Sequence, residues 1–162
     1  MNGELRVGIG FDAHAFAGAG PLVLAGLSIP HSAGLAGHSD ADLVCHAATD
    51  ALLGASGGED IGALFPSEDE TLRGASSIDL MRRAWAAIRG QGWQLVNLDA
   101  VLVLEEPRIA PHRAAMRESL AAALDVPVDR VTVRASTTDR LGFAGRGEGA
   151  ACQAVALLQR GS

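Results

Sequence analysis

The order of extended and helical segments along the chain constrains the fold more than any other feature. Apolar patterns predict strands over 4–16, 21–29, 93–104, 130–137 and 147–159, and helices over about 40–54, 76–89 and 110–125. Ser39 or Asp40 is expected to cap the first helix and Gly54 to end it. The stretches 30–38 and 55–75 are rich in Gly, Pro or acidic residues, so we expect loops there.

These segments lack strict βαβ alternation, which favours a two-layer α/β fold of the α+β kind, with a mixed sheet and helices on one face. A length of 162 residues fits one domain, and no Pro/Ser-rich linker divides it, so 1–162 is predicted to be a single domain. The second face of such a sheet would be rich in small apolar residues and uncovered. We expect self-association to cover it.

Composition narrows the class of protein. Hydrophobic residues make up 48% and charged residues 20%, as in ordinary globular proteins. The net charge is -6 and no Lys/Arg cluster is dense enough for nucleic-acid binding, so the positive charge for an anionic substrate must be local. Cys45 and Cys152 lack CxxC spacing, which favours free buried thiols over a disulfide. With neither a leader pattern nor a membrane-length apolar run, we expect a cytoplasmic protein without membrane partners.

Asp12, His14 and His46 carry the clearest chemical signal. Alternation along a strand puts Asp12 and His14 on one face about 7 Å apart, while Asp42, His46 and Asp50 recur every four residues on the predicted helix. We expect Asp42 and Asp50 to orient the His46 ring. Two His and one Asp would leave a zinc ion an open fourth position, as in catalytic sites. The alternative is three unrelated polar residues on separate elements.

Two further segments could bind phosphate. His38 and Ser39 precede a predicted helix N-terminus, which favours anions, although Ser39 could be only a cap. A run of hydroxyl side chains with one carboxylate follows the strand 130–137 and could bind a diphosphate and Mg²⁺, or form an ordinary Ser/Thr turn. That run is Ser136, Thr137, Thr138 and Asp139. The Gly-rich segment after it reads as a turn and bulge, and EEPRIAP (105–111) as a loop.

Several motifs together resemble the 2-C-methyl-D-erythritol 2,4-cyclodiphosphate synthase family of the non-mevalonate isoprenoid pathway. They are GIGFDAHAF, GHSDADLVCHAATDALLGA, DIGALFP and ASTTDRLGFAGRGEGAA, in this order and over nearly the whole chain. The resemblance implies a homotrimer with active sites between subunits and sheets around a central apolar channel. It also implies one Zn²⁺ per subunit, and Mg²⁺ or Mn²⁺ with the substrate diphosphate.

The resemblance assigns roles to matching residues. Zinc would be held by Asp12, His14 and His46, and the second cation by Asp139. His38 and Thr137 would stabilise the transition state. Substrate contacts would come from His38, Ser39, Asp60, Ile61, Gly62, Phe65, Pro66, Asp69, Leu104, Pro107, Arg108, Ala110, Ser136, Thr137, Thr138, Asp139, Phe143 and Arg146. The channel would be lined by Phe11, Arg146 and Glu148.

The implied reaction turns 4-diphosphocytidyl-2-C-methyl-D-erythritol 2-phosphate into a cyclic diphosphate and CMP. Asp139 stands where the family usually has Glu, and Arg108, Arg134 and Arg140 stand where Lys is common, so Mg²⁺ affinity is the property most open to change. The same residues are compatible with two rival functions. One is a zinc-dependent phosphohydrolase, with Asp50 or Asp42 as base. The other is a non-catalytic trimer that binds isoprenoid diphosphates.

Overall fold

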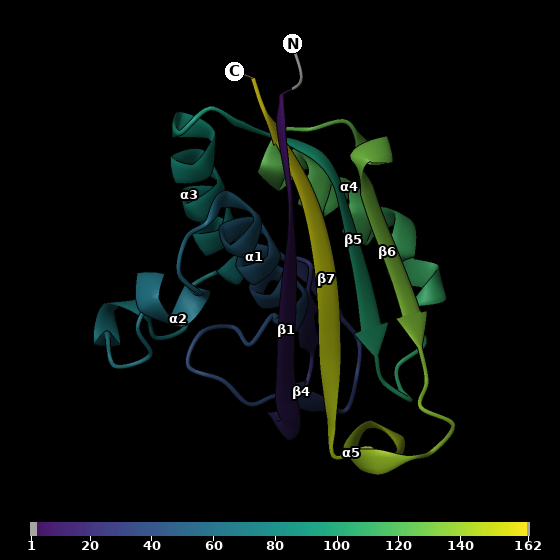
Figure 1. Cartoon of the computed structure of the whole chain (residues 1–162). Coiled ribbons are helices and arrows are strands. Elements are labelled where there is room, and N and C mark those ends of the chain that lie inside the picture. Colours follow the sequence, from purple (N-terminus) through teal and green to yellow (C-terminus); the bar gives the residue numbers. More distant parts are fainter. Residues whose placement is uncertain (1–2, 162) are drawn as a thin grey trace.

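The computed structural model describes residues 3–161, in which one five-stranded mixed sheet carries helices on one side (Figure 1). The strands lie in the order β4 (Ala33–Leu35), β1 (Glu4–Ala19), β7 (Gly149–Arg160), β5 (Trp93–Val103) and β6 (Val131–Ser136). β1 and β5 run antiparallel to β7 between them, whereas β6 is parallel to β5. The predicted α/β fold with a mixed sheet is therefore confirmed.

Three helices form the second layer, behind the sheet in Figure 1. α1 (Leu43–Ser56) packs on β1 and β7, α3 (Ser77–Gly90) packs on α1, and α4 (Arg113–Leu124) packs on α3 and β6. The Trp85 indole N–H donates to the Leu124 carbonyl at 2.7 Å, which ties α3 to α4. Among residues 3–161, none of the helices is both long enough and apolar enough to cross a membrane.

The prediction of one strand over 21–29 is wrong. The segment forms a hairpin of β2 (Leu22–Leu24) and β3 (Leu27–Ile29), with Ala25 and Gly26 as its two-residue turn. Both turn residues have positive φ, at 54° and 75°, as tight hairpin turns require. The fully buried Asp42 carboxylate accepts both of their N–H groups, at 2.9 and 2.7 Å. This long-range support is invisible in the local pattern.

The predicted start of α1 is also wrong, because Asp42 is its N-cap. The Asp42 carboxylate accepts the Cys45 N–H at 3.1 Å, so α1 begins at Leu43 rather than after Ser39 or Asp40. The helix continues through Gly54 and ends at Gly57, whose φ of 83° suits a left-handed cap. His38 and Ser39 therefore lie in the loop before α1, not at its first turn.

Short elements lie in segments that were predicted as loops or as parts of longer elements. They are β4 in the 30–38 loop, α2 (Ile61–Leu64) and a 3-10 turn (Glu70–Leu72) in the 55–75 loop, 3-10 turns over Ala110–His112 and Val128–Arg130, and α5 (Gly142–Gly145). Cys45 and Cys152 are buried free thiols, as predicted. Burial raises the pKa of Cys152 to about 12, which keeps it protonated.

The sheet face opposite the helices is apolar and bare in the single chain. Leu5, Val7, Ile9 and Phe11 alternate along β1 with residues that face α1, and each is about two-thirds exposed (61–68%). Val155 of β7 is also exposed. A contiguous apolar sheet face of this kind is typical of an interaction surface.

Candidate functional site

Two glycines of β1 place α1 directly over the strand. A Cβ atom on Gly10 would lie 1.9 Å from the Ala47 carbonyl oxygen of α1, so only glycine permits this approach. Gly8 meets α1 in the same way one turn further along. Because strand residues alternate, Asp12 and His14 continue the face that Gly8 and Gly10 begin. The close packing thus brings α1 over the two polar side chains of β1.

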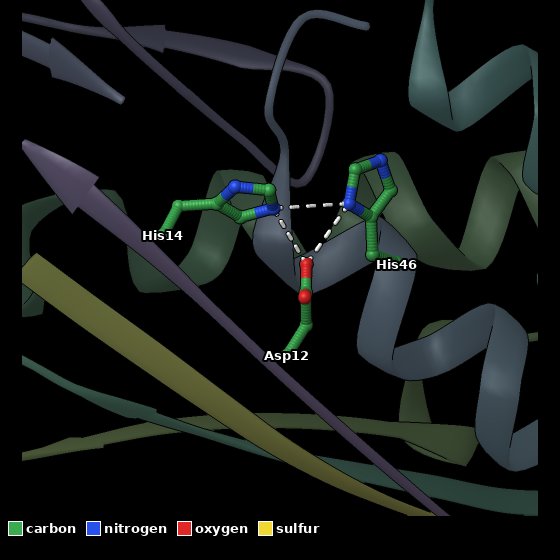
Figure 2. Close-up of side chains that lie close together, drawn as sticks. All are labelled: Asp12, His14 and His46. Carbon is green, nitrogen blue, oxygen red and sulfur yellow. Dashed lines mark hydrogen bonds and ion pairs between the residues drawn. The ribbon is translucent and has the colours of Figure 1, made fainter. Parts of the chain in front are cut away.

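The three predicted metal ligands meet at one point, as Figure 2 shows. The Asp12 carboxylate oxygen Oδ2 lies 2.7 Å from His14 Nε2 and 2.9 Å from His46 Nδ1. The two ring nitrogens are 3.3 Å apart. Asp12 and His14 come from β1 and His46 comes from α1. This part of the sequence prediction is confirmed as geometry: the residues form one cluster rather than three separate features.

The cluster fits a divalent metal ion. In tetrahedral zinc sites with ligands at about 2.0–2.1 Å, neighbouring ligand atoms are about 3.3 Å apart, so small outward shifts would seat an ion. His14 Nδ1 lies 2.6 Å from the Ala36 carbonyl oxygen, which can only accept a hydrogen bond. Nδ1 therefore donates to Ala36. Nε2 donates to Asp12 while it carries a proton, and loss of that proton would leave its lone pair facing an ion together with Asp12. One carboxylate and two imidazoles leave a fourth position open.

Charge coupling within the cluster shifts its pKa values. Burial by itself would raise the pKa of Asp12, but hydrogen bonds from His14 and His46 outweigh it and lower the pKa to about 2. The hydrogen bond to Asp12 raises the pKa of His14 above 6.5, against the opposing effect of burial. A carboxylate that stays ionised and neighbouring imidazoles form an anionic pocket for a cation.

The carboxylates expected to orient the His46 ring lie elsewhere, so that prediction is wrong. The Asp42 carboxylate accepts three backbone N–H groups, and the Asp50 carboxylate accepts the Ile61 N–H at 2.7 Å. His46 Nε2 instead lies 2.8 Å from the hydroxyl of Ser77 at the start of α3. Sequence analysis did not single out Ser77, because contact between α1 and α3 has no local signature.

A cavity of about 210 Å³ opens beside the cluster. Its walls include His14 and His46 and, among the predicted substrate residues, His38, Ser39, Ile61, Gly62, Phe65 and Pro66. The guanidinium of Arg83 in α3 lies 5.2 Å from the Phe65 ring. Asp60 caps α2, and the Asp69 carboxylate caps the next 3-10 turn. Their substrate roles stay predictions.

Two of the segments predicted to contact the substrate, 104–110 and 136–137, line a second cavity of about 190 Å³. Its walls include Leu104, Pro107, Arg108, Ala110, Ser136 and Thr137. The neighbouring Glu105 accepts the backbone N–H groups of Thr138 and Arg140, each at 3.2 Å, and so shapes the loop that carries Asp139. Sequence reasoning missed this function of Glu105, although the residue lies within EEPRIAP. The two cavities share no lining residue.

Of the remaining predicted residues, three lie just before the start of β7. Arg146 and Glu148 form an exposed ion pair at 2.8 Å. Phe143 of α5 and Glu148 border a cavity of about 290 Å³ whose wall also contains His14. Phe11 lies on the bare apolar face of β1. The channel role of these residues stays a prediction.

Known proteins match this chain over nearly its whole length. The YgbB family matches residues 5–159. A protein of Rubrobacter xylanophilus named 2-C-methyl-D-erythritol 2,4-cyclodiphosphate synthase is 58% identical, over 98% of this chain and 97% of its own. A protein of Pectobacterium atrosepticum with the same name is 53% identical, over 95% of this chain and 93% of its own.

Solved structures agree with the sequence matches. A 2C-methyl-D-erythritol-2,4-cyclodiphosphate synthase in a form bound to CDP superposes with a TM-score of 0.86 at 38% identity, covering 94% of this chain and 99% of that one. The bifunctional IspDF of Campylobacter jejuni gives a TM-score of 0.95 at 39% identity, and the match spans 98% of this chain but 43% of that longer one. The chain therefore belongs to the YgbB family, the family of the 2-C-methyl-D-erythritol 2,4-cyclodiphosphate synthases.

Proposed function

We propose that this protein converts 4-diphosphocytidyl-2-C-methyl-D-erythritol 2-phosphate into 2-C-methyl-D-erythritol 2,4-cyclodiphosphate and CMP, as a single domain over 1–162. One observation carries the proposal: relatives with this enzyme name match the chain over nearly its full length. The fold of the chain, in addition, brings Asp12, His14 and His46 together. An oxygen of the 2-phosphate attacks the β-phosphorus of the same molecule. The bond from that phosphorus to the bridging oxygen breaks, and CMP leaves with the oxygen and its electron pair.

We assign zinc to Asp12, His14 and His46, and Mg²⁺ or Mn²⁺ to the substrate diphosphate near Asp139. Bound cations of this kind supply Lewis-acid polarisation and neutralise phosphate charge. Asp139 is exposed and one methylene shorter than the Glu usual in the family, so it would bind its cation closely or through water. The chain's own part is to hold the reacting groups. Intramolecular positioning of this sort can contribute about 7–11 kcal/mol toward the barrier.

Residues of the two cavities would divide the substrate between them. In the first, His38 and Ser39 bind phosphate, and the walls from Ile61 to Pro66 enclose the methylerythritol, with Asp60 and Asp69 nearby. In the second, Leu104, Pro107, Arg108 and Ala110 hold cytosine, and Ser136, Thr137, Thr138 and Asp139 hold the diphosphate. Phe143 and Arg146 would complete the diphosphate loop. His38 and Thr137 would stabilise charge in the transition state.

We propose a homotrimer in which each active site combines one cavity from each of two neighbouring chains. Two observations support it. The cavities share no lining residue, although one substrate molecule must reach both. The bare face of β1 also exposes Leu5, Val7, Ile9 and Phe11, which association would bury. Phe11, Arg146 and Glu148 would line the central channel of the trimer.

The rival phosphohydrolase needs a base that can activate water at the metal. Asp42 is fully buried and accepts three backbone N–H groups, which excludes it from that role. Asp50 is half-buried and also accepts a backbone N–H. Neither carboxylate lines the cavity beside His14 and His46. The geometry thus favours attack by the internal phosphate over attack by water.

Phosphorus NMR of the purified protein with the cytidyl diphosphate substrate, Zn²⁺ and Mg²⁺ tests the proposal. We expect equimolar CMP and a cyclic diphosphate, both abolished by a chelator. CMP with a linear phosphate product would establish the hydrolase instead. Binding without turnover would establish the non-catalytic trimer. The variant His46→Ala should remain a folded trimer without turnover, and full turnover in it would refute the metal assignment.

A further inference from the structure

Ser77 lies between the metal cluster and a carboxylate that the proposed reaction does not use. Its side chain is fully buried at the first residue of α3. The Ser77 hydroxyl oxygen lies 2.8 Å from His46 Nε2, and on its other side it is hydrogen-bonded to the Asp40 carboxylate. Asp40 also accepts the Ser77 backbone N–H at 3.1 Å, so two bonds join these residues.

Donor and acceptor counting fixes the direction of each bond. An ionised carboxylate can only accept, and a serine hydroxyl has a single hydrogen. Asp40 accepts the backbone N–H groups of Ser77 and Asp42, at 3.1 and 3.2 Å, and also the hydroxyl of Ser77. The hydroxyl hydrogen of Ser77 points to Asp40, which leaves only lone pairs facing His46. His46 must therefore donate from Nε2.

The neighbouring hydroxyl of Ser39 does not change this result. It lies 3.1 Å from both His46 Nε2 and the Ser77 hydroxyl, and it accepts the Ala41 N–H at 3.3 Å. If Ser39 donated to Nε2, a lone pair of His46 would face a lone pair of Ser77 at 2.8 Å, which is repulsive. With hydrogen on Nε2, Ser39 can donate to Ser77, and every contact of Nε2 and of the two hydroxyls is favourable. The Nδ1 atom of His46 faces Asp12 Oδ2, and an ion between them would take its lone pair.

We propose that Ser77 and Asp40 are positioning residues that hold the His46 ring with its hydrogen on Nε2 and its Nδ1 lone pair aimed at the metal. The inference rests on the proposed metal role of His46, whose Nδ1 lies 2.9 Å from Asp12 Oδ2. His14 is held the opposite way, because the Ala36 carbonyl takes its Nδ1 hydrogen. In each ligand imidazole, one ring nitrogen thus donates a hydrogen bond to a protein oxygen and the other faces the metal position. This arrangement orients metal-bound histidines.

The decisive comparison is between two adjacent serines. Ser77→Ala removes the acceptor, whereas Ser76→Ala makes the same change one residue earlier, at the α3 cap, without contact to His46. Zinc affinity is measured by competition with a chromophoric chelator. We expect about 10–100-fold weaker binding for Ser77→Ala, as is usual when such a partner is lost. Ser76→Ala should bind within about twofold of wild type.

Asp40→Asn tests the outer member of the pair. The amide replaces one acceptor oxygen by a donor, so Ser77 can turn its hydrogen toward His46 and oppose the required ring state. We expect about tenfold weaker zinc binding, the lower end of the range for such partners. Binding equal to wild type in both Ser77→Ala and Asp40→Asn would overturn the inference.

Nitrogen-15 NMR of the zinc-loaded wild-type protein tests the inference without a substitution. We expect a slowly exchanging proton on His46 Nε2 that persists in Ser76→Ala and is lost to exchange in Ser77→Ala. A wild-type Nε2 proton that exchanges freely would refute the positioning role while leaving the metal assignment standing. A wild-type protein that binds no zinc would instead refute the metal assignment of the proposed function, and this inference with it.

Discussion

Gly10→Ala is the substitution that most directly tests how the fold builds the metal cluster. Gly10 lies two residues before Asp12, and its backbone touches α1 at Ala47, the residue after His46. A methyl group at this position would lie 1.9 Å from the Ala47 carbonyl oxygen and 2.8 Å from the Ala51 nitrogen. Real Cβ contacts are not shorter than 3.0 Å. Strand and helix must therefore separate by roughly 1 Å, because backbone atoms cannot rotate away.

The size of the effect follows from that displacement. Overpacking of a rigid contact costs about 1–3 kcal/mol of unfolding free energy. Functional side chains tolerate about 0.5 Å of misplacement, so a shift of roughly 1 Å moves His46 out of the cluster. A displacement of this size can reduce turnover about 100-fold. Zinc affinity should fall in parallel, since one ligand of the set has moved away from the other two.

Gly54→Ala is the matched control on the opposite side of the same contact. Its added methyl would meet nothing closer than 3.8 Å, an ordinary contact, and Ala is favoured over Gly by about 1 kcal/mol inside a helix. Urea denaturation of the zinc-free protein and chelator competition measure both variants. We expect Gly54→Ala to be as stable as wild type or more stable, with unchanged zinc affinity. Wild-type stability and zinc affinity in Gly10→Ala would refute the reasoning.

Three further predictions concern other parts of the chain. Asp42→Ala should lower the unfolding free energy by roughly 2–4 kcal/mol, because it removes a helix cap and leaves hairpin N–H groups unpaired; a loss in urea denaturation below about 1 kcal/mol would contradict this. Zinc affinity should fall as the pH decreases from 8 to 6, starting above pH 6.5, because protons compete for His14 and its pKa is raised. Calorimetry that finds constant affinity over this range would refute the assignment. Ile9→Asp, on the bare face of β1, should dissociate the proposed trimer in analytical ultracentrifugation while zinc affinity persists.

Periodicity was sufficient for most of the long elements. The Ile78, Met81, Trp85 and Ile88 spacing predicts the face that α3 buries, and the apolar strand 93–104 corresponds to β5 within one residue. Such segments carry their own signal, because the alternation or the 3.6-residue repeat needs no knowledge of the rest of the chain. The Asp12 and His14 pair was predictable for the same reason, since both lie on one strand.

What could not be predicted depends on contacts between distant segments. The turn at Ala25 and Gly26 needs the buried carboxylate of Asp42, which lies 17 and 16 residues away, respectively. The partner of His46 is Ser77, which lies 31 residues away on another helix. The helix pattern suggested Asp42 and Asp50 instead, because spacing of four residues describes one face of α1 but not what packs on it. Tertiary packing decides which neighbour a side chain meets.

β1 connects the metal cluster with the proposed assembly through its alternation. Gly8, Gly10, Asp12 and His14 face α1, while the large apolar side chains between them, such as Phe11, face the other way. A register shift of one residue would move every side chain to the opposite face and would put bulk where the helix must lie close. The register with β7 that turns Asp12 and His14 toward α1 is therefore also the one that presents the apolar face. One strand thus specifies both the ligand geometry and the surface through which a neighbouring chain would complete the active site.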